Sequence, residues 1–327
     1  MGLKAILAPI GTGIALSLLS TACFTGVEST PRIDDSALKK AKAAELSAED
    51  RYFASVVPAA ASSWQPGKEL IVTDSKIRLI LTPDASGVLP DLHPGDRLEF
   101  RRFEEVRNIV GESVTDAVFS TNGFPELRYR MPWDEKTLTT TAVPEIPFTV
   151  DPSLAARADS ILRNGDRRLY VLTPLWYDAG SEKSTGGYRL IAVEGDSIRP
   201  GNHIFPLKFY FHVADEELAS TPTGEGEKMV YMSHGGRGIA DSRGFGSLFS
   251  FTNPRKRYPQ ISPDIWTLII NSRVREGMTK DECRLALGSP TNIDLTPTRV
   301  GDLERWSYSD GIYLIFNTDG TLARYRL

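Results

Sequence analysis

Residues that hold metals or form covalent catalytic intermediates are scarce in this chain. Its 327 residues include only two cysteines, Cys23 and Cys283, and four histidines. No histidine belongs to an H-E-x-x-H pair or to a close histidine–cysteine set with the spacing of zinc ligands. The nucleophile elbow G-x-S-x-G and the phosphate loop G-x-x-x-x-G-K-[ST] are also missing. We therefore expect no metal site, no cofactor and no enzymatic activity.

The chain also lacks an excess of either charge. It has 38 lysines and arginines against 42 aspartates and glutamates, a net charge of −4. Because nucleic-acid-binding proteins concentrate basic residues on one face, this balance predicts no nucleic-acid partner. The hydrophobic share of 41% is enough for real cores, and at about 100–200 residues per domain the length predicts two or three domains.

An apolar run long enough to cross a membrane is the third absence. Residues 5–19 are mostly apolar, but a membrane-spanning helix needs about 20 such residues, and Pro9 interrupts the run. With Lys4 before the run and the small residues 20–22 after it, the pattern is typical of an export signal. We expect residues 1–22 to be a signal peptide.

Cys23 follows this signal where bacterial lipoproteins carry the cysteine that is diacylated after cleavage. The stretch resembles their lipobox, except that Leu19 lies four residues before the cysteine instead of three. Ordinary cleavage at the same bond, which would leave Cys23 unmodified, is the alternative. We favour lipidation at Cys23, because a lone cysteine would otherwise be an exposed reactive thiol. Membrane lipid is then a partner of the protein.

The residue after the lipobox bears on the destination. Phe24 replaces the aspartate that marks inner-membrane retention in Gram-negative lipoproteins. The resemblance therefore implies a lipid-anchored protein of the cell envelope, in the outer membrane if the cell has one.

The middle of the chain changes in composition twice. Residues 23–66 are rich in Ala, Ser, Lys and Glu, which predicts a lipidated tether and helical stalk. Beyond them, β-branched and aromatic runs alternate with turn residues. We expect a β-rich module over 67–150 and a second one over 151–255, with one short helix at 152–165. The fold class is then α+β, with antiparallel sheets.

Two helices with explicit start signals open the C-terminal unit, residues 260–327. Ser262 is placed as an N-cap before Pro263, which suits the first helical position. In the second helix, Thr279 and Glu282 have the spacing of a capping box.

The second helix also contains the other cysteine. Met278 and Cys283 occupy the positions of a hydrophobic staple, and Gly288 supplies the left-handed residue that ends the helix. With Cys23 acylated, Cys283 has no disulfide partner. We therefore predict that Cys283 packs in a core and does no chemistry.

Three strands, "LERWSYS", "IYLIFN" and "TLARYRL", are predicted after these helices. The unit should therefore be a small ααβββ domain with both helices on one face of the sheet.

This unit resembles the BamE (SmpA/OmlA) family, a component of the outer-membrane β-barrel assembly machinery. The resemblance rests on "VREGMTKDECRLALGSP", "RWSY" and "YLIFNTDGTLARY", in the order and spacing of the family, and covers about residues 260–327. Family members are short, whereas some 200 other residues precede the unit here, and Cys283 replaces a usual aliphatic residue. The resemblance implies envelope proteins as partners of the C-terminal domain.

These observations favour a non-catalytic binding or scaffolding role in outer-membrane protein assembly or envelope maintenance. An exposed apolar patch or an open sheet edge on the C-terminal domain would support it. One alternative is an envelope hydrolase that uses the glycine-rich loop 233–246 around His234. Another is a surface lipoprotein that captures a ligand by stacking on Trp133, Trp176 or Tyr177.

Overall fold

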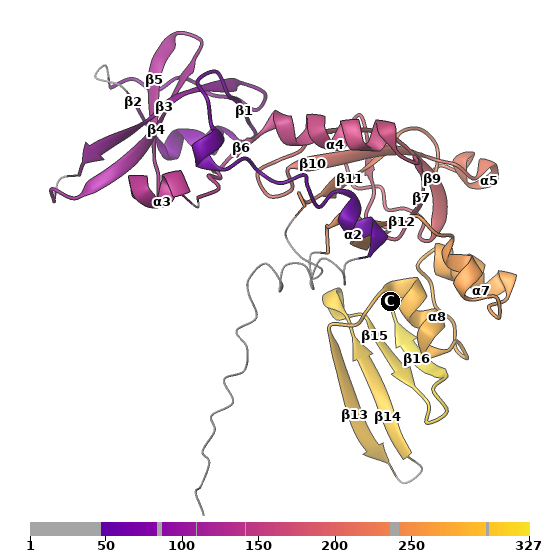
Figure 1. Ribbon diagram of the computed structural model, residues 1–327. Helices are drawn as coiled ribbons and strands as arrows, with labels where there is room; N and C mark the ends of the chain where they lie inside the picture. Colours follow the sequence, from indigo (N-terminus) through magenta and orange to yellow (C-terminus); the bar gives the residue numbers. More distant parts are fainter. Residues whose placement is uncertain (1–46, 84–86, 109, 141, 236–241, 299–300) are drawn as a thin grey trace, which may run out of the picture. The chain divides into compact units, whose positions relative to one another are not determined.

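Figure 1 shows the computed structural model, which describes residues 47–83, 87–108, 110–140, 142–235, 242–298 and 301–327. The structure is about 23% helical and 34% strand. All strand pairs within the described ranges are antiparallel. The prediction of mixed helix and β-rich antiparallel sheet is therefore confirmed. No helix within these ranges is long and apolar enough to cross a membrane.

The first sheet has six strands in the order β2-β5-β4-β3-β1-β6. Its strands are β1 (Glu69–Val72), β2 (Leu81–Pro83), β3 (Arg97–Arg107), β4 (Ser113–Thr121), β5 (Phe124–Arg130) and β6 (Thr149–Val150). Because alternate residues of a strand point to opposite faces, one face buries Phe100, Phe119 and Leu127, each at most 2% exposed. The short helices η1 (Ala61–Ser63), η2 (Ser75–Leu79) and α3 (Glu135–Thr140) contribute to the same core.

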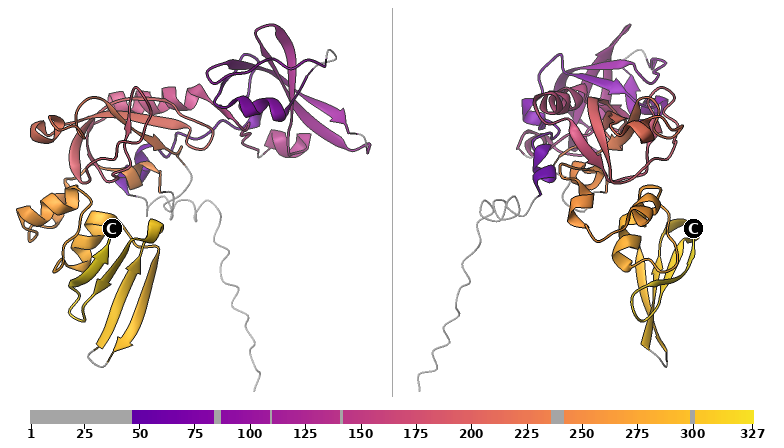
Figure 2. Two further views of the ribbon diagram at one scale, coloured as in Figure 1. Left: turned by 180° about the vertical axis from the view of Figure 1, so that it is seen from behind. Right: turned by 90° about the vertical axis from the view of Figure 1, so that its right-hand side faces the viewer.

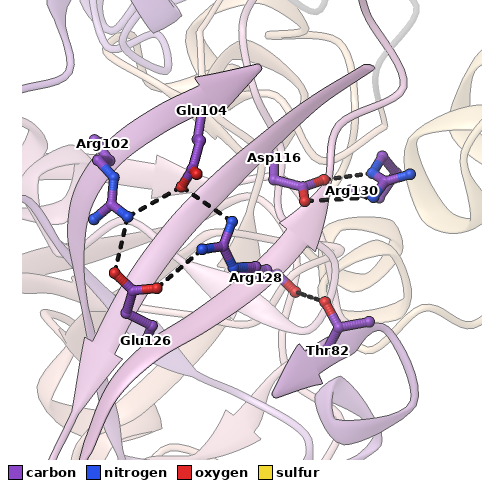
Figure 3. Close-up of polar contacts among 7 residues, drawn as sticks. All are labelled: Thr82, Arg102, Glu104, Asp116, Glu126, Arg128 and Arg130. Atoms are coloured by element: carbon purple, nitrogen blue, oxygen red, sulfur yellow. Dashed lines mark hydrogen bonds and ion pairs between the residues drawn. The ribbon is translucent and has the colours of Figure 1, made fainter. Parts of the chain in front are cut away.

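The opposite face of this sheet carries a ladder of paired charges. Figure 3 shows its arginines and carboxylates: Arg102, Glu104, Asp116, Glu126, Arg128 and Arg130. Arg102 and Arg128 each donate to both Glu104 and Glu126, at 2.8–3.0 Å. The bond from Arg102 lowers the pKa of Glu126 below its usual value. Since these charges satisfy one another, the face offers little to a charged partner.

The second sheet also has six strands, in the order β12-β7-β9-β10-β11-β8. Its strands are β7 (Arg168–Val171), β8 (Tyr177–Asp178), β9 (Ile191–Pro200), β10 (Leu207–Val213), β11 (Lys228–Met232) and β12 (Phe249–Ser250), with the short helices α5 (Glu216–Ala219) and α6 (Phe245–Leu248). Its core contains Phe209, Phe211 and Phe249, whose side chains are fully buried.

Helix α4 (Pro152–Asn164) packs on the second sheet, most extensively on β9. Asp151 caps it by accepting a hydrogen bond from the Ser153 amide at 2.9 Å. Leu154, Ala158 and Leu162 lie on the buried face, as their helical spacing predicts. The expected helix at 152–165 is confirmed.

The segment from residue 47 to residue 66 is not a stalk, and here the prediction was wrong. Helix α2 (Ala48–Tyr52) begins at the N-cap Ser47, and the chain beyond it enters two cores. Phe53 is 3% exposed in the core of the second sheet, whereas Trp64 is 7% exposed in that of the first. The residues between these anchors, 54–63, are mostly Ala and Ser, which is the composition of a solvated linker. Residues 23–46 of the expected tether and stalk lie outside the described residues.

Glu49 fastens α2 to the second sheet. Its carboxylate accepts hydrogen bonds from the Phe251 amide at 2.9 Å and from the Ser250 hydroxyl at 3.0 Å. Burial alone would raise the pKa of Glu49, but these hydrogen bonds outweigh it and lower the pKa below the usual value.

The lowered pKa of Glu49 predicts a pH-dependent contribution to stability. A carboxyl with a depressed folded-state pKa stabilises the fold above its unfolded value, and loses that contribution as the pH falls through the folded value. We expect Glu49→Gln to flatten the loss of stability below about pH 4.5, measured by urea unfolding at several pH values. An unchanged pH profile in the variant would contradict this role.

The C-terminal sheet has four strands, in the order β13-β14-β15-β16, where three were predicted. They are β13 (Asn292–Thr298), β14 (Gly301–Ser307), β15 (Tyr313–Phe316) and β16 (Leu322–Arg326), preceded by η3 (Pro254–Arg257), α7 (Pro263–Ile270) and α8 (Lys280–Leu287), with η4 (Ser309–Gly311) between β14 and β15. Strand β13 was missed because Pro297 and its polar residues do not read as a strand. The arrangement is therefore ααββββ, not ααβββ.

The start and stop signals of α8 are confirmed. The Thr279 side chain accepts from the Glu282 amide, and the Glu282 carboxylate accepts from the Thr279 amide at 2.8 Å. Gly288 follows the helix with a φ of 86°. In α7, Ser262 is the N-cap residue, but its hydroxyl donates to Asp264 and makes no capping bond to the helix backbone.

Arg189 connects the second sheet to α8. Its guanidinium donates to the Ala286 carbonyl at 3.1 Å, near the end of α8. Leu190 packs in the core of the C-terminal sheet although its φ is 57°, a costly conformation for a bulky side chain. Both sheets belong to the compact unit Glu45–Leu327, so this contact is a part of one packed structure.

Candidate binding sites

The two cysteines fall in very different places. Cys23 lies outside the described residues, so its lipidation stays a prediction. Cys283 is fully buried and has no disulfide, and it shares a core with Met278, its expected staple partner. Burial raises the pKa of the Cys283 thiol to about 12. Because the thiolate is the nucleophile, this cysteine is unsuited to chemistry.

Cys283→Val should therefore be tolerated. Valine keeps an apolar group of similar size in the core, so we expect the free energy of unfolding to change by less than about 1.5 kcal/mol. Cys283 of the folded wild-type protein should also react slowly with a thiol reagent at pH 8, whereas Cys283 of the unfolded protein should react rapidly. Rapid labelling of Cys283 in the folded protein would contradict the structural role.

The glycine-rich loop gives only part of the catalytic arrangement considered for it. Residues 236–241 lie outside the described residues. The Ser233 hydroxyl is buried and has no hydrogen-bond partner among the described residues, so it is not paired with His234. His234 Nε2 does lie 3.9 Å from Glu145 Oε1. A serine nucleophile needs a base within hydrogen-bond reach, and Ser233 has none in the described part of the chain.

His234 also lines a cavity of about 270 Å³ with largely apolar walls. The lining comes from four parts of the chain: residues 58–70, residues 144–154, the turn 202–206 between β9 and β10, and His234 after β11. Its apolar walls include Pro58, Trp64, Leu70, Ile146, Val150, Leu154 and Pro206. Its polar groups include Glu145, Asp151, Asn202, His203 and His234.

The aromatic residues considered for ligand stacking have mostly structural roles. Trp176 is fully buried, and its indole donates to the Thr173 carbonyl at 2.8 Å. Tyr177 lies on the edge strand β8, edge-to-face with Tyr231 at 5.0 Å. Trp133 is half-buried against the core of the first sheet. Trp176 cannot stack on a ligand in this structure, and neither of the others lines the cavity described above.

A second candidate site is the edge of the C-terminal sheet. Among the residues that the structure describes, strand β13 pairs only with β14, and its residues Ile293 and Leu295 are 49% and 62% exposed. The other edge is partly covered, because Leu322 of β16 exchanges hydrogen bonds with Gly277 and Met278. The sheet is therefore open at β13.

Searches against protein-family models, curated proteins and solved structures found no match for this chain. The functional assignment therefore rests on the sequence and the geometry of these two sites.

Sequence reasoning singled out His234 but missed the groups that join it in the cavity. Glu145 and Asp151 belong to the segment 144–154 and His203 to the turn 202–206, and none of them belongs to a recurrent motif. The one local signal is the pair Pro144 and Pro147, each of which fixes its own backbone φ and so stiffens this segment. It does not reveal which other segments face it.

Proposed function

We propose that this chain is a lipid-anchored protein of the cell envelope that binds another envelope protein, without catalysis, through its C-terminal domain. The open strand β13 is the observation that carries the proposal. The resemblance of residues 260–327 to the BamE family gives it further support from the sequence. The binding mode is the addition of an extended segment of the partner beside β13.

The side chains of β13 suit this mode. Ile293 lies opposite Trp306, and Leu295 lies opposite Glu304. Residues directly opposite one another project from the same face of a sheet, and Trp306 is fully buried. Ile293 and Leu295 therefore continue the apolar face of the domain core beyond the helices, where an added strand would cover them.

Pro297 limits the region that can accept a partner strand. Proline has no backbone N–H to donate, and proline on an edge strand is a usual protection against unwanted pairing. In the five residues before it, 292–296, every residue has a backbone N–H, and alternate residues direct their N–H and C=O away from β14. The partner segment is thus short, about five residues, with apolar side chains at alternating positions.

The anchor places this surface at a membrane. A diacylated cysteine with a further acyl chain on its amine gives stable attachment, and Cys23 is the residue that would carry it. Cys23→Ser should release the protein from the membrane fraction without changing its thermal unfolding. Retention of the variant in membranes would contradict the anchor and leave the β13 proposal intact.

Site-specific photo-crosslinking in intact envelopes tests the binding surface. A photoreactive residue at Leu295 should give adducts with a defined envelope protein, and Ile293→Lys should reduce them by about tenfold. Thr296→Lys is the matched control, because Thr296 also lies on β13 but points to the other face. Both substitutions are at exposed positions, so stability should change by less than about 0.5 kcal/mol. Adducts that are insensitive to Ile293→Lys, or equally sensitive to both changes, would reject the proposal.

A further inference from the structure

The cavity lined by His234 has the features of a preformed ligand site. The proposed function does not depend on this cavity. We propose that it binds a small amphiphilic amine, with a compact apolar body between residues 58–70 and 144–154 and a protonated amino group that faces Glu145. Ligand sites in proteins combine apolar walls with a few polar groups, and this cavity has both.

Close backbone packing fixes the two histidine-bearing turns. A Cβ at Gly235 would lie 2.1 Å from the Phe53 carbonyl oxygen, and one at Gly201 would lie 2.1 Å from that of Phe205. The Gly235 amide also donates to the Val56 carbonyl at 2.7 Å. His234 and His203 are therefore presented by backbone that has little room to move.

Backbone strain at the cavity wall also indicates a functional site. Phe148, within the segment 144–151, has a φ of 61°, a costly conformation for a large aromatic residue. Its ring packs edge-to-face on the His203 ring at 5.1 Å. Strained backbone persists only where the surroundings hold it, and it is concentrated at functional sites.

The apolar wall is equally well fixed. The Trp64 indole donates to the Ala59 carbonyl at 3.2 Å and packs edge-to-face on Phe100 at 5.2 Å. The volume of about 270 Å³ is slightly below the range for small-ligand pockets, about 300–1,000 Å³. The ligand is thus the size of a single ring with a short side chain, and not a polymer.

The charges of the lining select the polar group of the ligand. Asp151 is not available to a ligand, because its carboxylate forms an ion pair with Lys68 and caps α4. Glu145 has no ion pair with lysine or arginine among the described residues, and its side chain is 64% exposed. This carboxylate repels a carboxylate ligand and attracts an ammonium group. His234 Nε2, 3.9 Å from Glu145 Oε1, is a further polar atom beside this carboxylate.

Titration calorimetry with two matched probes tests the assignment. 2-Phenylethylamine and phenylacetate share a ring and a two-carbon chain but carry opposite charges. We expect the amine to bind the full chain in the millimolar range, at least about tenfold more tightly than phenylacetate. No binding of the amine up to about 10 mM, or equal binding of both probes, would overturn the proposal.

Two variants locate the binding. Glu145→Gln should lower the affinity for the amine by about fivefold or more, and reduce the preference for the amine over phenylacetate. Glu217→Gln on α5, an exposed glutamate outside the cavity lining, should bind as the wild type does. Unchanged amine binding in Glu145→Gln would reject the role of this carboxylate. Thermal unfolding of both variants checks that each is folded.

Discussion

Phe53→Ala is expected to lower the free energy of unfolding by about 3–5 kcal/mol, the usual cost of removing a buried phenylalanine. Phe53 is 3% exposed and packs edge-to-face on Tyr52 at 4.7 Å and on Phe245 at 4.8 Å. Its removal would leave a void between α2 and α6. Residues 47–64 run from the core of the second sheet to the core of the first. Loss of the Phe53 side chain should therefore weaken the packing of both cores.

Val57→Ala is the matched control for this experiment. Val57 belongs to the same segment but is 41% exposed, so the change should cost less than about 0.5 kcal/mol. Urea unfolding followed by circular dichroism measures both. If Phe53→Ala were as harmless as Val57→Ala, residues 47–64 would be a tether after all.

Arg189→Glu is expected to destabilise the C-terminal domain by about 3–5 kcal/mol, in the range reported for an uncompensated buried charge. Burial lowers the pKa of the Arg189 guanidinium, and its hydrogen bond to the Ala286 carbonyl lies at the negative end of the α8 dipole. A carboxylate at this position would face the same carbonyl oxygens. Both groups are negatively polarised and neither can donate a hydrogen bond, so they would repel one another.

Arg189→Met separates the charge from the packing. Methionine retains apolar contacts without a charge, and replacing a buried ionic group by an apolar one is often close to neutral. We expect a change of about 1 kcal/mol, mostly from the lost hydrogen bond. Hydrogen exchange of the α8 amides should accelerate strongly in Arg189→Glu and only slightly in Arg189→Met. Equal exchange in both variants would show that the helix end does not depend on the charge of Arg189.

The helices that could be predicted from the sequence are those whose start and stop signals lie within the helix and the residues next to it. Thr279, Glu282 and Gly288 lie within one short stretch, and the interactions that begin and end α8 are made inside that stretch. Helix α4 is similar, because the cap Asp151 and the stripe through Leu154 need no distant partner to be recognised. The same holds for the class of the fold, since strand-forming runs between turn residues predict antiparallel sheets.

The elements that the sequence did not predict depend on partners far along the chain. Strand β13 is a strand because β14 pairs with it, and its own residues carry a weak strand preference. Residues 47–64 have the composition of a stalk, and only their burial against residues such as Phe245 makes them structural.

The sequence by itself therefore determined the ends of α4 and α8, the antiparallel β-rich class and the packing role of Cys283, whereas lipid attachment at Cys23 stays a prediction. Tertiary structure alone decided that β13 is an open edge, that Glu145 lies beside His234, and that Arg189 meets the end of α8. The physical reason is the range of the interactions. Caps and alternating apolar residues act within a few positions, whereas edges and cavities exist only after distant segments have packed.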